Sequence, residues 1–204
     1  MTKIKVCGLT DKKEASYLNA QQVDFAGFVL FFPKSKRNLT ITQAKEIMND
    51  LDPAIKKVAV VVSPSIEQIK EIQEANFDII QIHGSLPDAV LNEISIPILK
   101  AFNISDMEHY PIYQKCEKIK GYVFDAQEPG SGKTFDWKLV TNIPRDHKLL
   151  LLAGGLTPNN VSQAIAALHP DGVDVSSCVE FTDKPGKDPE KIEQFIHAVR
   201  TWEK

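Results

Sequence analysis

The chain has 204 residues, of which 43% are hydrophobic and 25% charged, and its formal net charge is −3. This length and composition suit a single soluble domain with a sizeable core, so we expect residues 1–204 to form one domain. A mildly acidic chain lacks the basic face that non-specific nucleic-acid binding needs, which argues against a nucleic-acid partner. Any anionic ligand must therefore be held by local groups rather than by the overall charge.

The ends of the chain and its cysteines indicate a cytoplasmic protein. Residues 1–5 lack the apolar stretch of a signal peptide, and no apolar run approaches the ~20 residues that span a bilayer, so we expect no membrane partner. Cys7, Cys116 and Cys178 are odd in number and widely spaced, which predicts neither a disulfide framework nor a zinc site. Free thiols suit a reducing cytosol.

Short apolar runs recur along the whole chain. They are rich in Val, Ile, Leu and Phe, as in parallel strands that are buried on both faces. We expect eight strands, at residues 4–7, 25–31, 58–62, 79–82, 98–102, 121–125, 149–153 and 172–175.

An amphipathic, helical pattern follows each apolar run. Ser65 with Gln68 three residues later resembles a capping box, and Pro87 stands where a first helical turn tolerates proline. We expect the helices to begin near Thr10–Asp11, Thr40, Ser65, Pro87, Ser105, Phe135, Thr157–Pro158 and Asp188–Pro189.

Eight strand–helix units predict an α/β protein with a single-domain (β/α)8 barrel, also called a TIM barrel. An open, doubly wound sheet shows the same alternation and is the alternative. Eight evenly spaced units favour the barrel. In a barrel the chemistry lies at the carboxyl ends of the strands and in the loops that follow them.

Two candidate proton-transfer groups end predicted strands. Cys7 ends the first strand just before a predicted helix, where a thiol with a lowered pKa could act as a base, although free cysteines are more often buried structural residues. Asp125 ends the sixth, where burial would raise the pKa of its carboxyl and suit a general acid.

Other polar residues follow the second and fourth strands. Arg37 lies in a loop with Lys34 and Lys36, and its forked donors suit a carboxylate, whereas we interpret the two lysines as solvated. His83 follows the fourth strand, and we assign it no catalytic role but expect it to contact the ligand.

The loops after the last two strands carry a predicted phosphate site. Gly154 and Gly155 follow the seventh strand, while Asp174, Ser176 and Ser177 end and follow the eighth. Glycine backbone groups and serine hydroxyls in these two loops are typical donors to phosphate. A further sequence, residues 130–134, superficially resembles a P-loop, but Gln127 stands where that motif requires glycine. We interpret it as a flexible loop that covers the site.

Taken in order, these segments resemble the phosphoribosylanthranilate isomerases of tryptophan biosynthesis. The resemblance extends over nearly the whole chain, from residue 3 to residue 188. The matching segments are residues 5–10, 27–29, 33–35 with Arg37, 81–84, 132–137, 152–161, 172–177 and 185–188.

The resemblance implies an Amadori rearrangement that requires no metal and no cofactor. The substrate would be a small phosphosugar, N-(5'-phosphoribosyl)anthranilate, and no partner protein is implied. In the family, the residue matching Asp125 protonates the furanose ring oxygen, and the residue matching Cys7 removes the C2 proton. The residue matching Arg37 holds the anthranilate carboxylate, and the glycine and serine loops hold the phosphate.

One position departs from the family, and two other functions stay open. The family usually has glycine where this chain has Cys178, and a cysteine there would be strained if its φ were positive. We expect Cys178 to keep a permissible conformation but to weaken phosphate binding. The alternatives are another phosphate-binding barrel enzyme, of histidine or thiamine biosynthesis, and a phosphosugar-binding barrel without catalysis.

Overall fold

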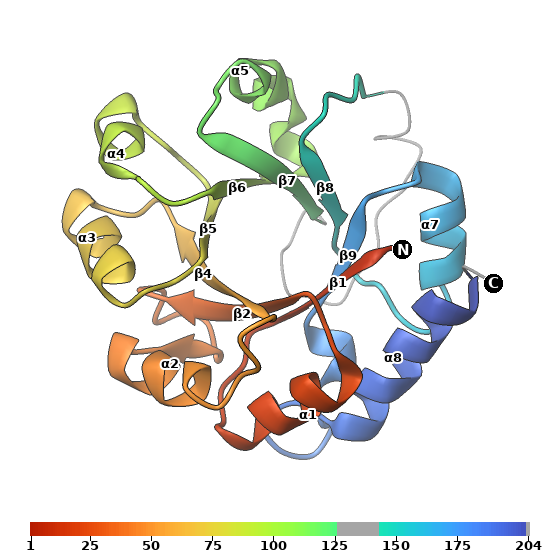
Figure 1. Ribbon diagram of the computed structural model, residues 1–204. Helices are drawn as coiled ribbons and strands as arrows, with labels where there is room; N and C mark the ends of the chain where they lie inside the picture. Colours follow the sequence, from red (N-terminus) through yellow and green to blue (C-terminus); the bar gives the residue numbers. More distant parts are fainter. Residues whose placement is uncertain (126–142, 203–204) are drawn as a thin grey trace.

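Parallel strands close into a barrel with helices around it (Figure 1), in a computed structural model that describes residues 1–125 and 143–202, with the backbone alone at 104–106. The strands are β1 (Lys3–Cys7), β2 (Phe25–Leu30), β3 (Asn38–Leu39), β4 (Lys56–Val62), β5 (Ile79–His83), β6 (Ile98–Asn103), β7 (Ile119–Asp125), β8 (Leu149–Leu152) and β9 (Gly172–Val175). The sheet runs β1-β9-β8-β7-β6-β5-β4-β2-β3, and pairing of β1 with β2 closes it. The predicted barrel is confirmed, and the open sheet is excluded.

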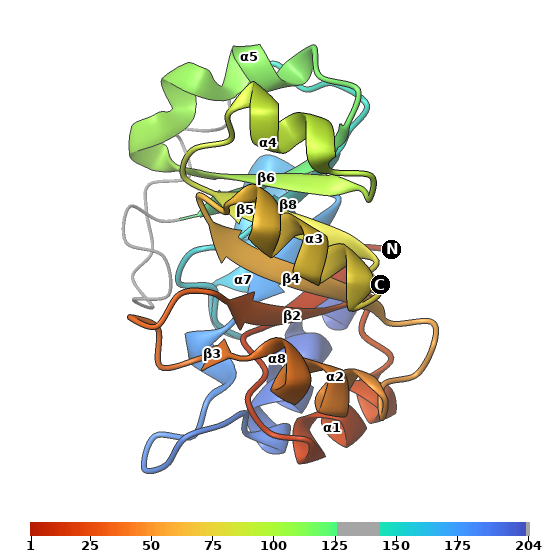
Figure 2. The same cartoon turned by 90° about the vertical axis from the view of Figure 1, so that its left-hand side faces the viewer.

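The helices lie outside the barrel between successive strands, as Figures 1 and 2 show. They are α1 (Lys13–Gln21), α2 (Ile41–Met48), α3 (Ile66–Glu74), α4 (Asp88–Glu93), α5 (Tyr110–Gln114), α7 (Val161–Leu168) and α8 (Pro189–Trp202), with 3-10 helices η1 (Ile104–His109) and η2 (Ser177–Val179). No helix in the described ranges is long and apolar enough to cross a membrane.

Most predicted boundaries agree with the structure to within a few residues. The capping box of Ser65 with Gln68 is present, and Thr40 with Gln43 forms a second one. The structure differs from the prediction in several details. The helices expected near Thr10–Asp11 and Thr157–Pro158 begin at Lys13 and Val161, the α-helix expected at Ser105 is a 3-10 helix followed by α5, and β3 was not predicted.

The late start of α1 has a local cause. The Glu14 carboxylate accepts the N–H groups of Thr10 and Asp11, at 2.6 and 3.3 Å, and thus holds these residues outside the helix. The short strand β3 extends the sheet at the end of β2, where Asn38 and Leu39 pair with Val29 and Leu30. The helix predicted near Phe135, with the Gly132–Trp137 segment and the loop at residues 130–134, lies outside the described residues.

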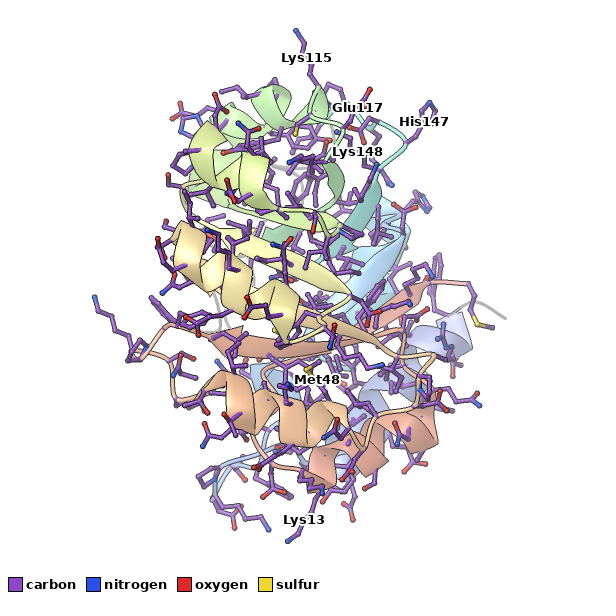
Figure 3. The ribbon with its side chains drawn as sticks, turned by 60° about the vertical axis from the view of Figure 1, so that its left-hand side comes forward. Lys13, Met48, Lys115, Glu117, His147 and Lys148 are labelled. Carbon is purple, nitrogen blue, oxygen red and sulfur yellow. The ribbon has the colours of Figure 1, made fainter. Side chains whose placement is uncertain are left out.

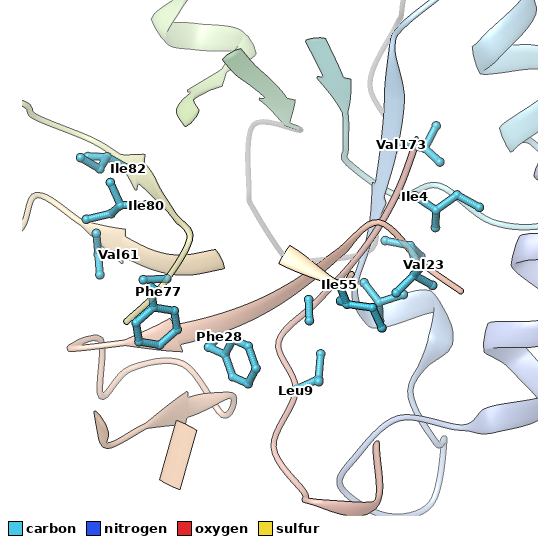
Figure 4. Close-up of a cluster of buried hydrophobic side chains, with 14 of the residues drawn as sticks. Ile4, Leu9, Val23, Phe28, Ile55, Val61, Phe77, Ile80, Ile82 and Val173 are labelled. Carbon is cyan, nitrogen blue, oxygen red and sulfur yellow. The ribbon is translucent and has the colours of Figure 1, made fainter. Parts of the chain in front are cut away.

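Alternation along each strand separates two cores. Outward side chains such as Ile4, Ile80 and Val173 pack against the helices (Figure 4). Inward side chains fill the barrel, namely Phe25, Val58, Val60, Leu99, Ala101, Val123, Leu151 and Ala153. Since Cys7 packs with this inner set, and Asp125 stands two residues after Val123, both face the barrel axis.

Aspartates tie the starts of three strand pairs together. Asp24, Asp78 and Asp171 each precede a strand, and the carboxylate of each accepts the N–H of the second residue of the neighbouring strand at 2.8 Å. The backbone N–H of each aspartate donates to the carbonyl of the same residue, at 2.9–3.0 Å. These paired bonds fix the starting register of β1 with β2, β4 with β5 and β8 with β9.

Two partly buried lysines cap the ends of helices on the outside of the barrel. Lys118 Nζ donates to three backbone carbonyls at the end of α4, at 2.8, 2.9 and 3.0 Å. Lys148 Nζ donates to three at the end of α5, at 2.7, 2.8 and 3.1 Å. The last carbonyls of a helix lack the N–H partners that a further turn would supply, so an ammonium group adds hydrogen bonds to them and matches the helix dipole. By contrast, Lys13 and Lys115 extend into solvent (Figure 3).

The aspartate ties predict a measurable loss of stability. Asp78→Ala leaves the Lys57 N–H without its acceptor and is expected to lower the free energy of unfolding by about 1–2 kcal/mol. Asp78→Asn keeps an acceptor and should lose less. Urea unfolding measures both. As a control, Lys56→Ala removes only an exposed ion pair to Asp78, which is worth about 0.2–1 kcal/mol. Equal losses for Lys56→Ala and Asp78→Ala would contradict the role of the N–H bond.

Candidate active site

A cavity of about 610 Å³ opens at the carboxyl ends of the barrel strands. In Figure 2 these ends point away from the two chain termini. All nine predicted site residues line this cavity: Cys7, Arg37, His83, Asp125, Gly154, Gly155, Asp174, Ser176 and Ser177. A second hollow, of about 120 Å³, lies outside the barrel beside β7, β8 and α5 and contains none of them.

The lining combines apolar walls with a few polar groups. Val29, Val60, Val62 and Leu156 contribute the apolar part. A concave, mostly apolar site with a few directed polar groups is the usual form of a small-molecule site. No group of three or more His, Cys, Asp or Glu side chains in the described ranges is arranged to hold a metal ion.

Cys7 and Asp125 reach the cavity from separate strands. Cys7 ends β1 and Asp125 ends β7, and β9 and β8 stand between these strands in the sheet. Asp125 is buried, at 9% exposure, while Cys7 is half-buried. The two groups can therefore address different sides of one ligand.

Cys7 does not lie next to a helix start, as the sequence suggested. Helix α1 begins six residues later, at Lys13, so its dipole does not act on the thiol. Instead, burial raises the pKa of Cys7, against the opposing positive charge of Lys5. In the free protein the Cys7 pKa thus lies above, not below, its ordinary value.

His83 is neutral at physiological pH. Burial, with the nearby charges of Lys100 and Lys5, lowers its pKa to about 3. Its Nε2 lies 2.9 Å from the side-chain nitrogen of Gln81, a residue that also lines the cavity. His83 can therefore offer a ligand a hydrogen bond but not a positive charge.

Arg37 is held by a carboxylate that sequence analysis missed. Its Nε donates to Glu180, which also accepts Lys36 Nζ at 2.7 Å and the buried Lys187 Nζ at 3.1 Å. One buried carboxylate therefore fixes three cations. Among the described residues, Arg37 Nη2 is buried without a partner, which leaves a donor for an incoming anion.

The two loops that were predicted to hold phosphate lie on the same cavity wall. Gly154 and Gly155 have φ of 84° and 62°, a region that side chains other than glycine rarely adopt. Ser177 begins η2, whose first hydrogen bond runs from Val179 N to Ser176 O at 3.3 Å. The backbone N–H groups at the start of η2, before Val179, therefore make no hydrogen bond within this helix. A short extra helix at this position is typical of phosphate sites in barrels.

Ser176 also serves a structural purpose. Its hydroxyl donates to the Cys7 carbonyl at 2.9 Å, and its backbone carbonyl accepts Lys187 Nζ at 3.1 Å. Cys178, within η2, is not among the residues with positive φ, so it bears no backbone strain of the kind that glycine would relieve. The expected permissible conformation of Cys178 is confirmed.

Several polar residues that line or support the cavity were not predicted. They are Lys5, Gln81, Asn103, Glu180 and Lys187. The sequence could have indicated Lys5, Gln81 and Asn103, because each is a charged or amide side chain at an inward-facing position of an otherwise apolar strand. Glu180 and Lys187 come together only through the fold of the loop after β9.

Comparisons with known proteins agree with this geometry. Residues 4–198 match the N-(5'phosphoribosyl)anthranilate (PRA) isomerase family. The chain belongs to this family. Its members act in tryptophan biosynthesis, and this chain is 36% identical over 201 residues to the isomerase of Streptococcus mutans, covering 98% of this chain and 100% of that one. It is 39% identical over 210 residues to the isomerase of Thermoanaerobacter pseudethanolicus, covering 98% of both chains.

Solved structures of PRA isomerases share the fold. The crystal structure of the Thermotoga maritima isomerase has a TM-score of 0.86 and 32% identity, and covers 98% of this chain and 100% of that one. A structure of a PRA isomerase in complex with reduced 1-(o-carboxyphenylamino)-1-deoxyribulose 5-phosphate has a TM-score of 0.82, 31% identity and the same coverage.

The Glu180 cluster predicts a pH-dependent contribution to stability. Burial alone raises the Glu180 pKa, but Arg37, Lys187 and Lys36 outweigh it and lower this pKa to about 2. Because the folded pKa is depressed, the stabilisation is complete above the unfolded value, near 4.5, and is lost as the pH falls towards 2. Glu180→Gln should therefore destabilise the protein by about 2 kcal/mol at pH 6 and by progressively less below pH 4.

Urea unfolding at pH 6, 4 and 3 measures this difference. Glu46→Gln, at an exposed position on α2, is the control, and its difference from the wild type should stay small at every pH. A destabilisation by Glu180→Gln that is the same at pH 6 and pH 3 would contradict the ion-pair explanation.

Proposed function

We propose that this chain isomerises N-(5'-phosphoribosyl)anthranilate to 1-(2-carboxyphenylamino)-1-deoxyribulose 5-phosphate through acid–base chemistry by Asp125 and Cys7. The main support is that these two groups, on separate strands, border one cavity together with Arg37 and the glycine and serine loops. The phosphorylated sugar bound by a related isomerase supports the same substrate class.

Asp125 starts the reaction as a general acid. It donates its proton to the furanose ring oxygen, the bond from C1 to that oxygen breaks, and the nitrogen lone pair forms a protonated Schiff base at C1. The buried position of Asp125 suits a carboxyl group that must hold a proton before it acts.

Cys7 completes the isomerisation as a general base. Its thiolate removes the proton from C2, and the electrons of the C2–H bond form the C1–C2 double bond of an enolamine. Tautomerisation then gives the ketone, as the C2 hydroxyl loses a proton and C1 gains one, and the proton left on Cys7 returns to Asp125 by exchange with solvent. The product has the same atoms and electrons as the substrate, so we expect no metal or cofactor.

The remaining residues bind the two ends of the substrate. The unpartnered Arg37 Nη2 would hold the anthranilate carboxylate, with Glu180 fixing the guanidinium from the other side. Gly154, Gly155 and the start of η2 at Ser177 would hold the phosphate. Contacts far from the reacting carbons supply binding energy that positions C1 and C2. His83, Asp174 and Ser176 line the cavity between these ends.

We also propose that residues 1–204 act as one catalytic domain on this small molecule, in the cytoplasm and without a partner protein. All three cysteines are free, which suits a reducing compartment.

The fluorescence of N-(5'-phosphoribosyl)anthranilate, generated in situ, allows a direct assay of the reaction. The wild type should consume it rapidly, and Cys7→Ser and Asp125→Asn should each lower kcat by about 10²–10⁴-fold, as expected for loss of a general base or acid. Arg37→Ala should mainly raise KM, because it removes a binding contact.

Binding of inorganic phosphate to the same samples separates the outcomes. A wild type that binds phosphate but does not turn over the substrate would contradict the proposed reaction and favour another phosphosugar or a binding protein. Variants at Cys7 or Asp125 that keep wild-type kcat would contradict the assigned roles.

The position of Cys178, in the loop after β9, predicts a second kinetic effect. Cys178→Gly gives the start of η2 the glycine that is usual in the family and removes a side chain beside the proposed phosphate position, so it should lower KM with little change in kcat. Initial rates over a range of substrate concentrations measure this change. An unchanged or higher KM would show that Cys178 does not weaken phosphate binding.

A further inference from the structure

A lysine lies inside the barrel, beside the thiol that we propose as the base. Lys5 is fully buried on β1, two residues before Cys7 and therefore on the same face of the strand. Its Nζ donates to Asp174 Oδ2 of β9 at 2.8 Å. A buried ammonium group is costly unless it is paired, so its place in the barrel needs a reason beyond packing.

Gly27 leaves the space in which Lys5 and Cys7 meet. It is the residue of β2 that pairs with Cys7. A Cβ atom built on Gly27 would lie 2.8 Å from Cys7 Sγ and 3.1 Å from Lys5 Nζ. Because both distances start from the same Cβ position, Cys7 Sγ and Lys5 Nζ are less than about 6 Å apart. Opposite charges within this range change each other's pKa.

The charges that face Cys7 favour different protonation states of the thiol. Burial raises the Cys7 pKa, Lys5 from β1 lowers it, Asp174 from β9 raises it, and Lys187, from the segment between η2 and α8, lowers it. The neighbouring strand β2 contributes only Gly27 at this point. Burial alone would lower the Lys5 pKa, but Asp174 and Cys7 outweigh it, so Lys5 stays an ammonium group.

We propose that Lys5 and Gly27 form a thiolate site for Cys7, in which the Lys5 ammonium favours the anionic form of the sulphur against the effect of burial and Gly27 provides the room for their contact. Lys5 is a positioning residue here, since it acts on Cys7 and not on the substrate. The proposal rests on the proposed role of Cys7 as the base. Once Cys7 has taken the C2 proton, Lys5 still has Asp174 as its counter-ion, so no step leaves it unpaired.

The test measures the thiol itself, in the absence of substrate. The rate at which iodoacetamide alkylates Cys7 is followed from pH 6 to 10 by mass spectrometry, which separates Cys7 from the other cysteines. Lys5→Met should slow alkylation at pH 7 by at least about tenfold, because it removes the positive charge that favours the thiolate. Asp174→Asn should speed it up, because it removes the opposing negative charge. Loss of packing alone would not give changes of opposite sign.

Two further variants keep the test decisive if Lys5→Met folds poorly. Lys5→Met/Asp174→Asn leaves no unpaired buried carboxylate, and it should react at least about tenfold more slowly than Asp174→Asn alone. Lys118→Met is the matched control, a lysine whose ammonium group binds carbonyls outside the barrel, and its Cys7 should react like that of the wild type. Equal rates with and without Lys5 in the Asp174→Asn background would overturn the proposal.

Gly27→Ala tests the room for the contact. The added methyl group would lie 2.8 Å from Cys7 Sγ and must displace it, so we expect at least a tenfold loss of kcat with a smaller change in KM. Unchanged kcat and alkylation rate in Gly27→Ala would overturn the part assigned to Gly27.

The thiolate site and the proposed function fail in different ways. If the wild type does not isomerise the substrate but Lys5→Met still slows alkylation, the function is wrong and the thiolate site stands. If the wild type turns over and the Lys5 variants alkylate at the wild-type rate, the function stands and the thiolate site is wrong.

Discussion

The register of β1 is the constraint on which the rest of the site depends. This strand closes the barrel by pairing with β2 on one side and with β9 on the other. The first pairing places Cys7 opposite Gly27, and the second places Lys5 opposite Asp174. A shift of one residue would turn Cys7 and Lys5 towards the helices, where neither would have its present neighbours. The aspartate tie of Asp24 to the N–H of Ile4 therefore helps to set the chemistry at the other end of the strand.

Among the described residues, two clusters of ion pairs border the cavity, each with its own counter-ions. Lys5 and Asp174 lie within the barrel, while Glu180 holds Arg37, Lys36 and Lys187 above it. Lys187 also donates to the Ser176 carbonyl, and the Ser176 hydroxyl donates to the Cys7 carbonyl. The proposed carboxylate, phosphate and proton-transfer sites thus share a single network of hydrogen bonds. We expect substitutions within it to affect more than one kinetic constant.

Sequence reasoning accounts for the barrel and for the lining of the cavity because both follow from local patterns. Short, continuous apolar runs identified the eight barrel strands, and each predicted site residue ends a strand or follows one. The same reasoning failed where distant segments meet. It placed Cys7 beside the start of a helix that in fact begins six residues later, at Lys13. It also did not find Glu180, whose partner Arg37 lies far away in the sequence, or Lys187, which pairs with Glu180. Lys5 was within reach, since a lysine in an apolar strand that faces the barrel axis must have a counter-ion.

The aspartate ties at Asp24, Asp78 and Asp171 have a consequence for how this protein can change over time. They stand where strands begin, whereas the cavity residues stand where strands end. Substitutions that alter substrate preference therefore need not touch the bonds that set the order of the sheet. The loops at the carboxyl ends of the strands can therefore change during evolution while the hydrogen bonds at the strand starts are kept. Each such change then has only a small effect on the stability of the barrel.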